Sequence, residues 1–90
     1  MKYIVSWTLP HGTFNAAAGR FLQAGGLPPA SVKLIGRWHG MNGHGFAVVE
    51  TSDAKALYAW VMEWSDLLMI DTTPCLEDSD AGEVLHSLKR

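Results

Sequence analysis

The most constraining feature of this 90-residue chain is the order in which two hydrophobic patterns alternate along it. Segments rich in β-branched and aromatic residues indicate strands, and apolar residues that recur every three to four positions indicate helices. The strand-like segments are Lys2–Thr8, Val32–His39, His44–Thr51 and Met69–Leu76. Because helical patterns follow the first, third and fourth strands, the predicted order is β-α-β-β-α-β-α. Its first six elements match the ferredoxin-like βαββαβ sandwich, so we expect one α+β domain over residues 1–90 with a short extra C-terminal helix.

The helical segments carry recognisable start and stop signals. Thr13 is the expected N-cap of the first helix, and Gly25 and Gly26 are expected to end it. Thr51 or Ser52 is the expected N-cap of the second helix. The apolar faces of these two helices are predicted to comprise Phe14, Ala18, Phe21 and Leu22, and then Ala54, Leu57, Tyr58, Val61, Trp64 and Leu68.

The last helix and the last strand show two further signals. Asp80, with Glu83 three residues later, resembles a capping box at the start of the helix. The apolar side chains expected to dock this helix are Val84, Leu85 and Leu88, and the basic pair Lys89 and Arg90 suits its C-terminal end. Pro74 cannot donate a ladder hydrogen bond, which favours an edge position for the last strand.

The hairpin between the second and third strands determines which residues share a face of the sheet. A pairing of His39 with His44 across the four-residue loop would place Arg37 opposite Phe46, and Lys33 opposite Glu50. All of these side chains would then share the face that the helices leave open. Such a mixed apolar and polar face is typical neither of a dry core nor of a solvated surface. It suits two sheets that pack against each other and enclose a partly polar cavity, although a slip of one residue would exchange the two faces.

Size, charge and cysteine content limit the partners and the cellular location that we expect for this protein. A chain this short buries a modest fraction of its surface, yet 48% of its residues are apolar and four are tryptophans, so burial against a second copy is expected. The formal net charge is −2 with scattered basic residues, which disfavours nucleic acid. No segment is long and apolar enough for a membrane span, and the single Cys75 does not suggest a secreted disulfide framework. We therefore expect a cytoplasmic homodimer.

The sequence also resembles a group of small uncharacterised bacterial proteins within the dimeric α/β-barrel superfamily. The segments that carry this resemblance are 1–7 (MKYIVSW), 32–40 (VKLIGRWHG), 45–51 (GFAVVET) and 58–64, which contains Tyr-Ala-Trp and Glu-Trp. The resemblance implies two ferredoxin-like subunits that pack sheet against sheet. It does not imply an activity, because that superfamily includes cofactor-free monooxygenases, lactone isomerases, haem-binding members and stress-response proteins.

Arg37, His39 and His44 are the candidate catalytic residues. Arginine holds a carboxylate or enolate oxygen through its planar fork, and histidine transfers protons near neutral pH. Trp7 and Phe46 are the candidate apolar walls of a ligand site. The alternative interpretation is structural. In it, the histidines are exposed cross-strand neighbours at the hairpin, Arg37 forms an ion pair at an interface, and Trp7 packs in the core or at the interface.

Glu50 is the remaining candidate ligand-binding residue, either as a base or as the orienting partner of a histidine. A cross-strand ion pair with Lys33 is the alternative. The spacing of His39, His44, His11 and Asp71 fits no compact metal signature, so neither a metal nor a cofactor is expected. The sequence leaves two functions open. One is a homodimer that binds a small anionic or aromatic molecule between its sheets, with or without the activity of a cofactor-free isomerase or monooxygenase-like enzyme. The other is a non-catalytic structural, stress-response or sensor module.

Overall fold

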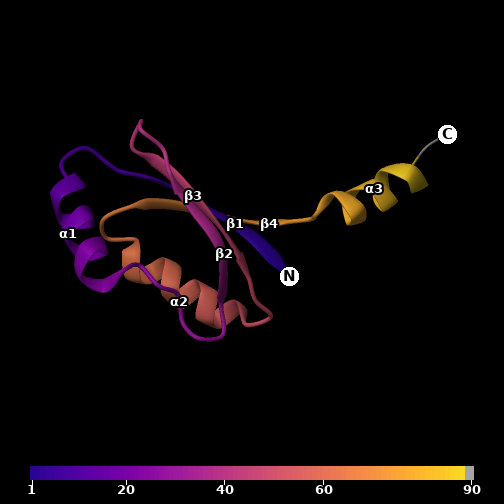
Figure 1. Ribbon diagram of the computed structural model, residues 1–90, viewed down its shortest axis with the longest axis horizontal. Helices are drawn as coiled ribbons and strands as arrows, with labels where there is room; N and C mark the ends of the chain where they lie inside the picture. The colour runs from indigo at the N-terminus through magenta and orange to yellow at the C-terminus, as the bar shows by residue number, and fades with distance from the viewer. Residues whose placement is uncertain (89–90) are drawn as a thin grey trace.

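The computed structural model describes residues 1–88 and contains four strands and three helices in the order expected from the sequence. The strands form one antiparallel sheet with the order β2-β3-β1-β4, as in a ferredoxin-like fold. Helices α1 and α2 cover one face of this sheet (Figure 1). None of the described helices is long and apolar enough to cross a membrane. The element bounds are β1 Lys2–Thr8, α1 Phe14–Ala24, β2 Lys33–His39, β3 His44–Glu50, α2 Ala54–Trp64, β4 Met69–Cys75 and α3 Asp78–Ser87.

The core lies between the two central strands and α2. Its buried cluster contains Val5, Val32, Val49, Leu57 and Trp60. Ala47 and Val49 on β3 are fully buried, and their small size lets the large aromatic side chains of α2 approach the sheet. Strand β4, which contains Pro74, is an edge strand as predicted.

The helix ends follow the sequence signals with small shifts. Helix α1 ends at Gly25, whose φ of 77° is left-handed and whose N–H donates to the Phe21 carbonyl oxygen at 2.7 Å. Thr13 occupies the N-cap position, but its hydroxyl donates to the Pro10 carbonyl oxygen. The N-cap of α2 is Asp53, which accepts a hydrogen bond from Ala56 N–H. The prediction of Thr51 or Ser52 was therefore wrong, because the Thr51 hydroxyl is engaged by Asp53 N–H and by the Ser31 carbonyl.

The predicted hairpin register is correct at the start of β2 and wrong after a β-bulge at Ile35. Lys33 faces Glu50 and Leu34 faces Val49, as expected. Beyond the bulge, Arg37 pairs with Ala47, Trp38 with Phe46 and His39 with Gly45. One extra residue in β2 exchanges the two faces of the strand. Arg37 and His39 therefore lie on the face that α1 and α2 cover.

Room for one large side chain accounts for this register. Trp38 lies on the face of the sheet without helices, which we call the open face, and its ring stacks on Phe46 with centroids 5.2 Å apart. The ring also covers Gly36, where an added Cβ would lie 2.6 Å from it. An indole on the helix-covered side would instead have to fit against the buried Ala47.

The expected docking of the last helix was wrong. Helix α3 projects away from the sheet on the side of the open face (Figure 1), and none of its ten residues is buried. It begins at Asp78 rather than at Asp80, with Glu77 as the N-cap. The basic pair Lys89 and Arg90 lies outside the described residues.

Gly45 provides a test of the packing of Trp7 on the helix-covered face. A Cβ at position 45 would overlap the Trp7 indole, whereas a Cβ at Gly19 in α1 would meet nothing within 4 Å. We expect Gly45→Ala to lower the free energy of unfolding by about 1–3 kcal/mol through overpacking. Gly19→Ala should raise it by about 0.5–1 kcal/mol, because glycine is costly inside a helix. Urea unfolding followed by far-UV circular dichroism measures both changes, and equal stability of the two variants would contradict this packing.

The ion pair between Arg20 and Asp66 gives the fold an acid-sensitive component. Two guanidinium nitrogens of Arg20 donate to the two carboxylate oxygens of Asp66 at 2.9 and 2.8 Å, joining α1 to the segment after α2. The hydrogen bond to Arg20 lowers the pKa of Asp66 below its ordinary value of 3.8. Because the carboxylate is favoured in the folded state, its contribution is complete above pH 3.8 and is lost as the pH falls through the lower pKa of the folded state.

We therefore expect the unfolding free energy of Asp66→Asn to fall less between pH 6 and pH 3 than that of the wild type. Asp71→Asn, which removes a carboxylate from the open face, is the matched control. Urea titrations at the two pH values measure the difference, and identical pH dependence in wild type and Asp66→Asn would contradict it.

Candidate functional site

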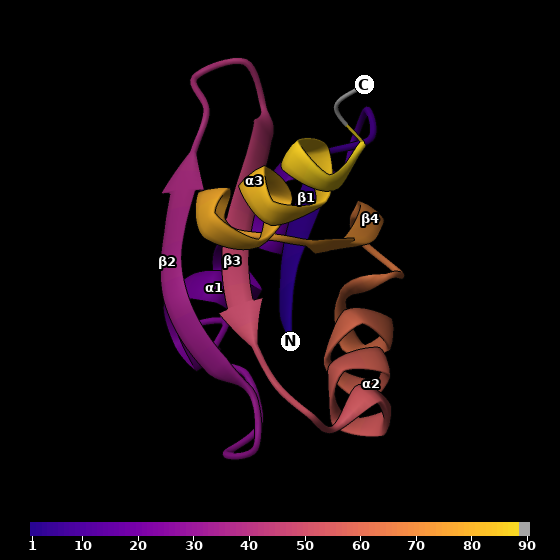
Figure 2. The same cartoon turned by 90° about the vertical axis from the view of Figure 1, so that its right-hand side faces the viewer.

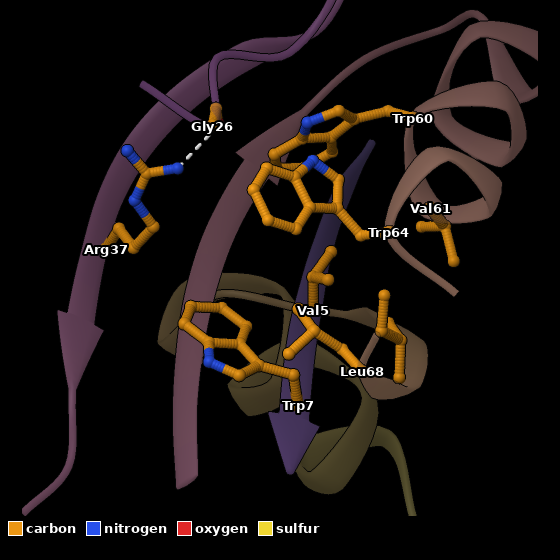
Figure 3. A pocket seen from close by; sticks show the side chains of 9 residues that line it. Val5, Trp7, Gly26, Arg37, Trp60, Val61, Trp64 and Leu68 are labelled. Atoms are coloured by element: carbon orange, nitrogen blue, oxygen red, sulfur yellow. Dashed lines mark hydrogen bonds between the residues drawn. The ribbon is translucent and has the colours of Figure 1, made fainter. Parts of the chain in front are cut away.

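Two adjoining cavities lie between the sheet and its covering helices, and together we call them the helix-side cleft. The inner cavity, about 60 Å³, is lined mainly by Val5, Trp7, Arg37, Trp60, Trp64 and Ile70 (Figure 3). The outer cavity, about 260 Å³, is bordered mainly by Trp7, Phe14, Ala17, Phe21, His39 and Trp64. The two cavities share Trp7, Trp64 and Leu68, so they are neighbouring parts of one depression. Its walls are almost entirely apolar, as in sites for organic ligands.

Arg37 is the one charged side chain of the cleft among the described residues. Its guanidinium nitrogens donate to the carbonyl oxygens of Gly26 at 2.6 Å and of Gly25 at 3.0 Å. The guanidinium carbon also lies 4.9 Å from the centre of the Phe21 ring, within cation–π range. Burial lowers the pKa of Arg37 from its ordinary value. Since arginine has five N–H groups, two bonds to the backbone leave donors for another acceptor.

Two glycines in sequence create this position for Arg37. Gly25 and Gly26 have φ values of 77° and 58°, which are left-handed and therefore suit glycine. A Cβ on Gly26 would lie 3.0 Å from an Arg37 nitrogen and 3.1 Å from the Phe21 ring. The chain after α1 can approach the arginine closely because neither residue carries a side chain. The Gly-Gly pair, identified in the sequence as a helix stop, thus also shapes the cleft.

Trp60 adds a second hydrogen-bond donor to the inner cavity. The residue is only 7% exposed, and its indole nitrogen Nε1 is buried without a hydrogen-bond partner among the described residues. In Figure 3 this nitrogen lies on the edge of the ring that is turned toward Gly26 and Arg37. No aspartate or glutamate lines either cavity in the described part of the chain. The cleft therefore presents donors and positive charge without a compensating acid.

His39 stands at the outer cavity between two aromatic rings. Its imidazole makes edge-on contacts with Trp7 and Phe21, with ring centroids 5.8 and 5.3 Å away. It follows Arg37 by two positions on β2, so both side chains face the helices. The imidazole is exposed beside the apolar cavity, so a molecule bound there would lie next to it.

The remaining predicted site residues lie on the open face. His44, Phe46, Trp38 and Asp71 border a groove of about 620 Å³, which Trp7 and His39 also line. Glu50 lies at the far end of β3 opposite Lys33 and Lys2, and it forms no ion pair with Lys33 among the described residues. The structure thus brings Arg37, His39 and Trp7 to the helix-side cleft, while Trp7 and His39 also border the groove that contains His44 and Phe46. Glu50 lies apart from both places.

Sequence reasoning missed the contributions of Trp60, Trp64 and Phe21 to the cleft. Helical spacing placed Phe21 and Trp64 on the apolar faces of their helices, which is accurate but does not reveal that they line a cavity. An indole N–H in a wholly apolar stripe was the available signal, because a buried donor requires an acceptor. Among residues 1–88, no three histidine, cysteine, aspartate or glutamate side chains gather in a group that could hold a metal ion.

Comparisons with known proteins place the chain in a family. A model of a domain of unknown function, DUF3303, matches residues 1–89, which is nearly the whole chain. Searches of curated proteins and of solved structures find no match. The chain therefore belongs to the DUF3303 family, whose members share a domain of uncharacterised function.

Proposed function

We propose that this protein is a cytoplasmic small-molecule-binding protein whose ligand occupies the helix-side cleft. The ligand would have an aromatic or apolar body and an oxygen acceptor, such as a carboxylate or a keto group. The observation that carries this proposal is the buried Trp60 N–H, which has no acceptor within residues 1–88, in the same cavity as the Arg37 guanidinium.

The energetics of buried donors support an acceptor at this place. A buried N–H without a hydrogen bond costs about 1–3 kcal/mol, and a natural core retains few such groups. An acceptor atom in the inner cavity would remove that cost. Since Arg37 has donors left after binding Gly25 and Gly26, the same acceptor group would receive a charge-assisted bond. An anionic oxygen therefore fits better than a neutral one.

The shape of the cleft supports an aromatic or apolar body. Trp7, Trp64 and Phe21 provide flat walls, and the outer cavity of about 260 Å³ is close to the ~300 Å³ lower limit of typical ligand sites. A molecule the size of a phenyl- or indolyl-carboxylic acid would place its ring in the outer cavity and its acid group toward Arg37.

The same arrangement contains the parts needed for proton transfer beside a carbonyl group. In this proposal Arg37 would hold the carboxylate or developing enolate oxygen, and His39 at the outer cavity would accept the proton from the adjacent carbon. The aromatic walls would exclude water from the reacting carbon. This division of roles keeps the predicted pairing of Arg37 with a histidine but assigns it to the opposite face of the sheet.

A second candidate site is the open-face groove, as part of a homodimer in the dimeric α/β-barrel superfamily that the sequence resembles. Its support is the joint presence of His44, Asp71 and Phe46 along a groove of about 620 Å³. A second copy over the open face would enclose this groove between two sheets. Ligand binding that is lost on substitution of His44 but unchanged on substitution of Trp60 or Arg37 would favour this site. If the protein binds no small organic acid, a structural or sensor module is favoured instead.

Ligand binding is testable with phenylacetate, phenylpyruvate, indole-3-acetate and cyclohexanecarboxylate as probes. We expect at least one probe to raise the melting temperature of the wild type and to show saturable binding by calorimetry. Trp60→Phe keeps an aromatic ring but removes the N–H, so it should raise Kd about 5- to 10-fold, equivalent to one hydrogen bond of about 1–1.5 kcal/mol. Arg37→Met should raise Kd more than Trp60→Phe does, because it removes a charged donor, whose hydrogen bond is stronger than that of a neutral N–H.

Lys33→Met is the matched control for Arg37→Met, because it removes one positive charge from the same strand on the open face. Its Kd should equal that of the wild type. If no probe binds, or if Trp60→Phe and Arg37→Met bind as tightly as Lys33→Met, the helix-side cleft is not the ligand site.

A further inference from the structure

The polar side chains that line the inner cavity of the helix-side cleft share one property, which is that they donate hydrogen bonds and do not accept them. An indole has a single N–H donor and a guanidinium has several, and neither group has an acceptor. In the described part of the chain these side chains are Trp7, Arg37, Trp60 and Trp64. The carbonyl oxygens of Gly25 and Gly26 are already bound by the guanidinium. A chemical group that enters the cavity therefore meets side-chain donors but no side-chain acceptor.

The acidic side chains of the described residues lie away from this cleft. Glu63 and Asp66, near the end of α2, border a different hollow on the surface, and Asp66 is bound by two nitrogens of Arg20. Helix α3, with the acids of its first turn, lies on the other side of the sheet (Figures 1 and 2). His39 at the outer cavity carries no negative charge in either protonation state. Within residues 1–88 the cleft thus offers no counter-charge to a cation.

We propose that the cleft selects aromatic carboxylic acids by the substituent on the carbon next to the carboxylate, and that it takes 2-oxo or unsubstituted acids and rejects amino acids. This inference rests on the ligand site proposed above. The carboxylate accepts hydrogen bonds from Trp60 and Arg37, and the keto oxygen of a 2-oxo acid is a further acceptor among donors. The ammonium group of an amino acid loses its water beside Arg37 and finds neither an acceptor side chain nor a counter-charge in return.

Charge, rather than size, is the basis of this selectivity. A binding site rejects a competing molecule when it leaves a charged or polar group of that molecule unpaired. A hydroxyl group is close to an ammonium group in size, but it is neutral, so it is not repelled by Arg37 and costs less to remove from water. The expected order of affinity, from tightest to weakest, is phenylpyruvate, 3-phenylpropionate, 3-phenyllactate and L-phenylalanine.

Calorimetric titration of the wild type at neutral pH tests this order. 3-Phenylpropionate and L-phenylalanine have the same ring, chain and carboxylate and differ in the ammonium group. We expect the Kd of L-phenylalanine to be about tenfold or more above that of 3-phenylpropionate. The Kd of 3-phenyllactate, which controls for bulk, should lie closer to that of 3-phenylpropionate. In NMR spectra the indole N–H signal of Trp60, identified by its absence from Trp60→Phe, should move downfield when an acid binds.

A carboxylate introduced into the cleft should weaken the discrimination against amino acids. Leu68 borders both cavities, so Leu68→Glu supplies a counter-charge for the ammonium group. The ratio of the Kd of L-phenylalanine to that of 3-phenylpropionate should therefore fall toward one. Met69→Glu adds the same charge at the exposed neighbouring residue, outside the cleft, and should keep the wild-type ratio. Circular dichroism shows whether both variants are folded.

The outcomes separate this inference from the ligand site on which it rests. If 3-phenylpropionate binds and moves the Trp60 signal, but L-phenylalanine binds as tightly, the selectivity is overturned and the ligand site stands. A folded Leu68→Glu that keeps the wild-type ratio also overturns the selectivity. If no acid binds, or if the acids bind without moving the Trp60 signal, the ligand site fails and the selectivity fails with it. If Leu68→Glu does not fold, the Kd ratio of the wild type decides.

Discussion

The two hydrogen bonds from Arg37 to the carbonyls of Gly25 and Gly26 connect the two sides of the inner cavity of the helix-side cleft. They tie the end of α1 to β2, at a point where no side chain separates the two backbones. Without a guanidinium at this place, the carbonyl groups after α1 would lie beside an apolar cavity with fewer partners. The same side chain is the only charge in the helix-side cleft of the described structure, so in the proposed function the residue that links α1 to β2 would also select the ligand.

A structural role for Arg37 and a binding role are compatible because of the geometry of its side chain. Backbone carbonyls hold the guanidinium at a fixed position, so a ligand would not have to order a flexible four-bond side chain. Trp60 is held equally firmly by the core cluster around Val49 and Leu57. Two preorganised donors that face one small cavity form a better recognition element than two mobile ones.

The sequence was sufficient for the order of elements, the sheet class and the edge position of β4, because strand and helix periodicity are local properties. It was insufficient for the face on which Arg37 lies. That face depends on the bulge at Ile35, and the bulge depends on whether the Trp38 ring fits over Gly36 and against Phe46, which are contacts in three dimensions. Arg37 and His39 therefore lie with Trp7 on the helix-covered face, whereas His44, Phe46 and Glu50 lie on the open face, and the roles of all six in a site stay predictions. The prediction that α3 docks on its own domain was wrong for a related reason. An amphipathic pattern predicts that the apolar side of a helix is buried, but it does not identify the surface that buries it.

The bulge also determines which side chains lie on each face of the sheet. By turning Arg37 and His39 toward the helices, it places Trp38 on the open face, where the Trp38 ring stacks on Phe46. The open face is more apolar there than the predicted register would make it. The helix-covered face carries the Arg37 charge and the Trp60 N–H, which has no hydrogen-bond partner among the described residues, in a cavity with aromatic walls. In a chain of 90 residues, one inserted position in one strand thus decides which side chains line the helix-side cleft and which lie on the open face.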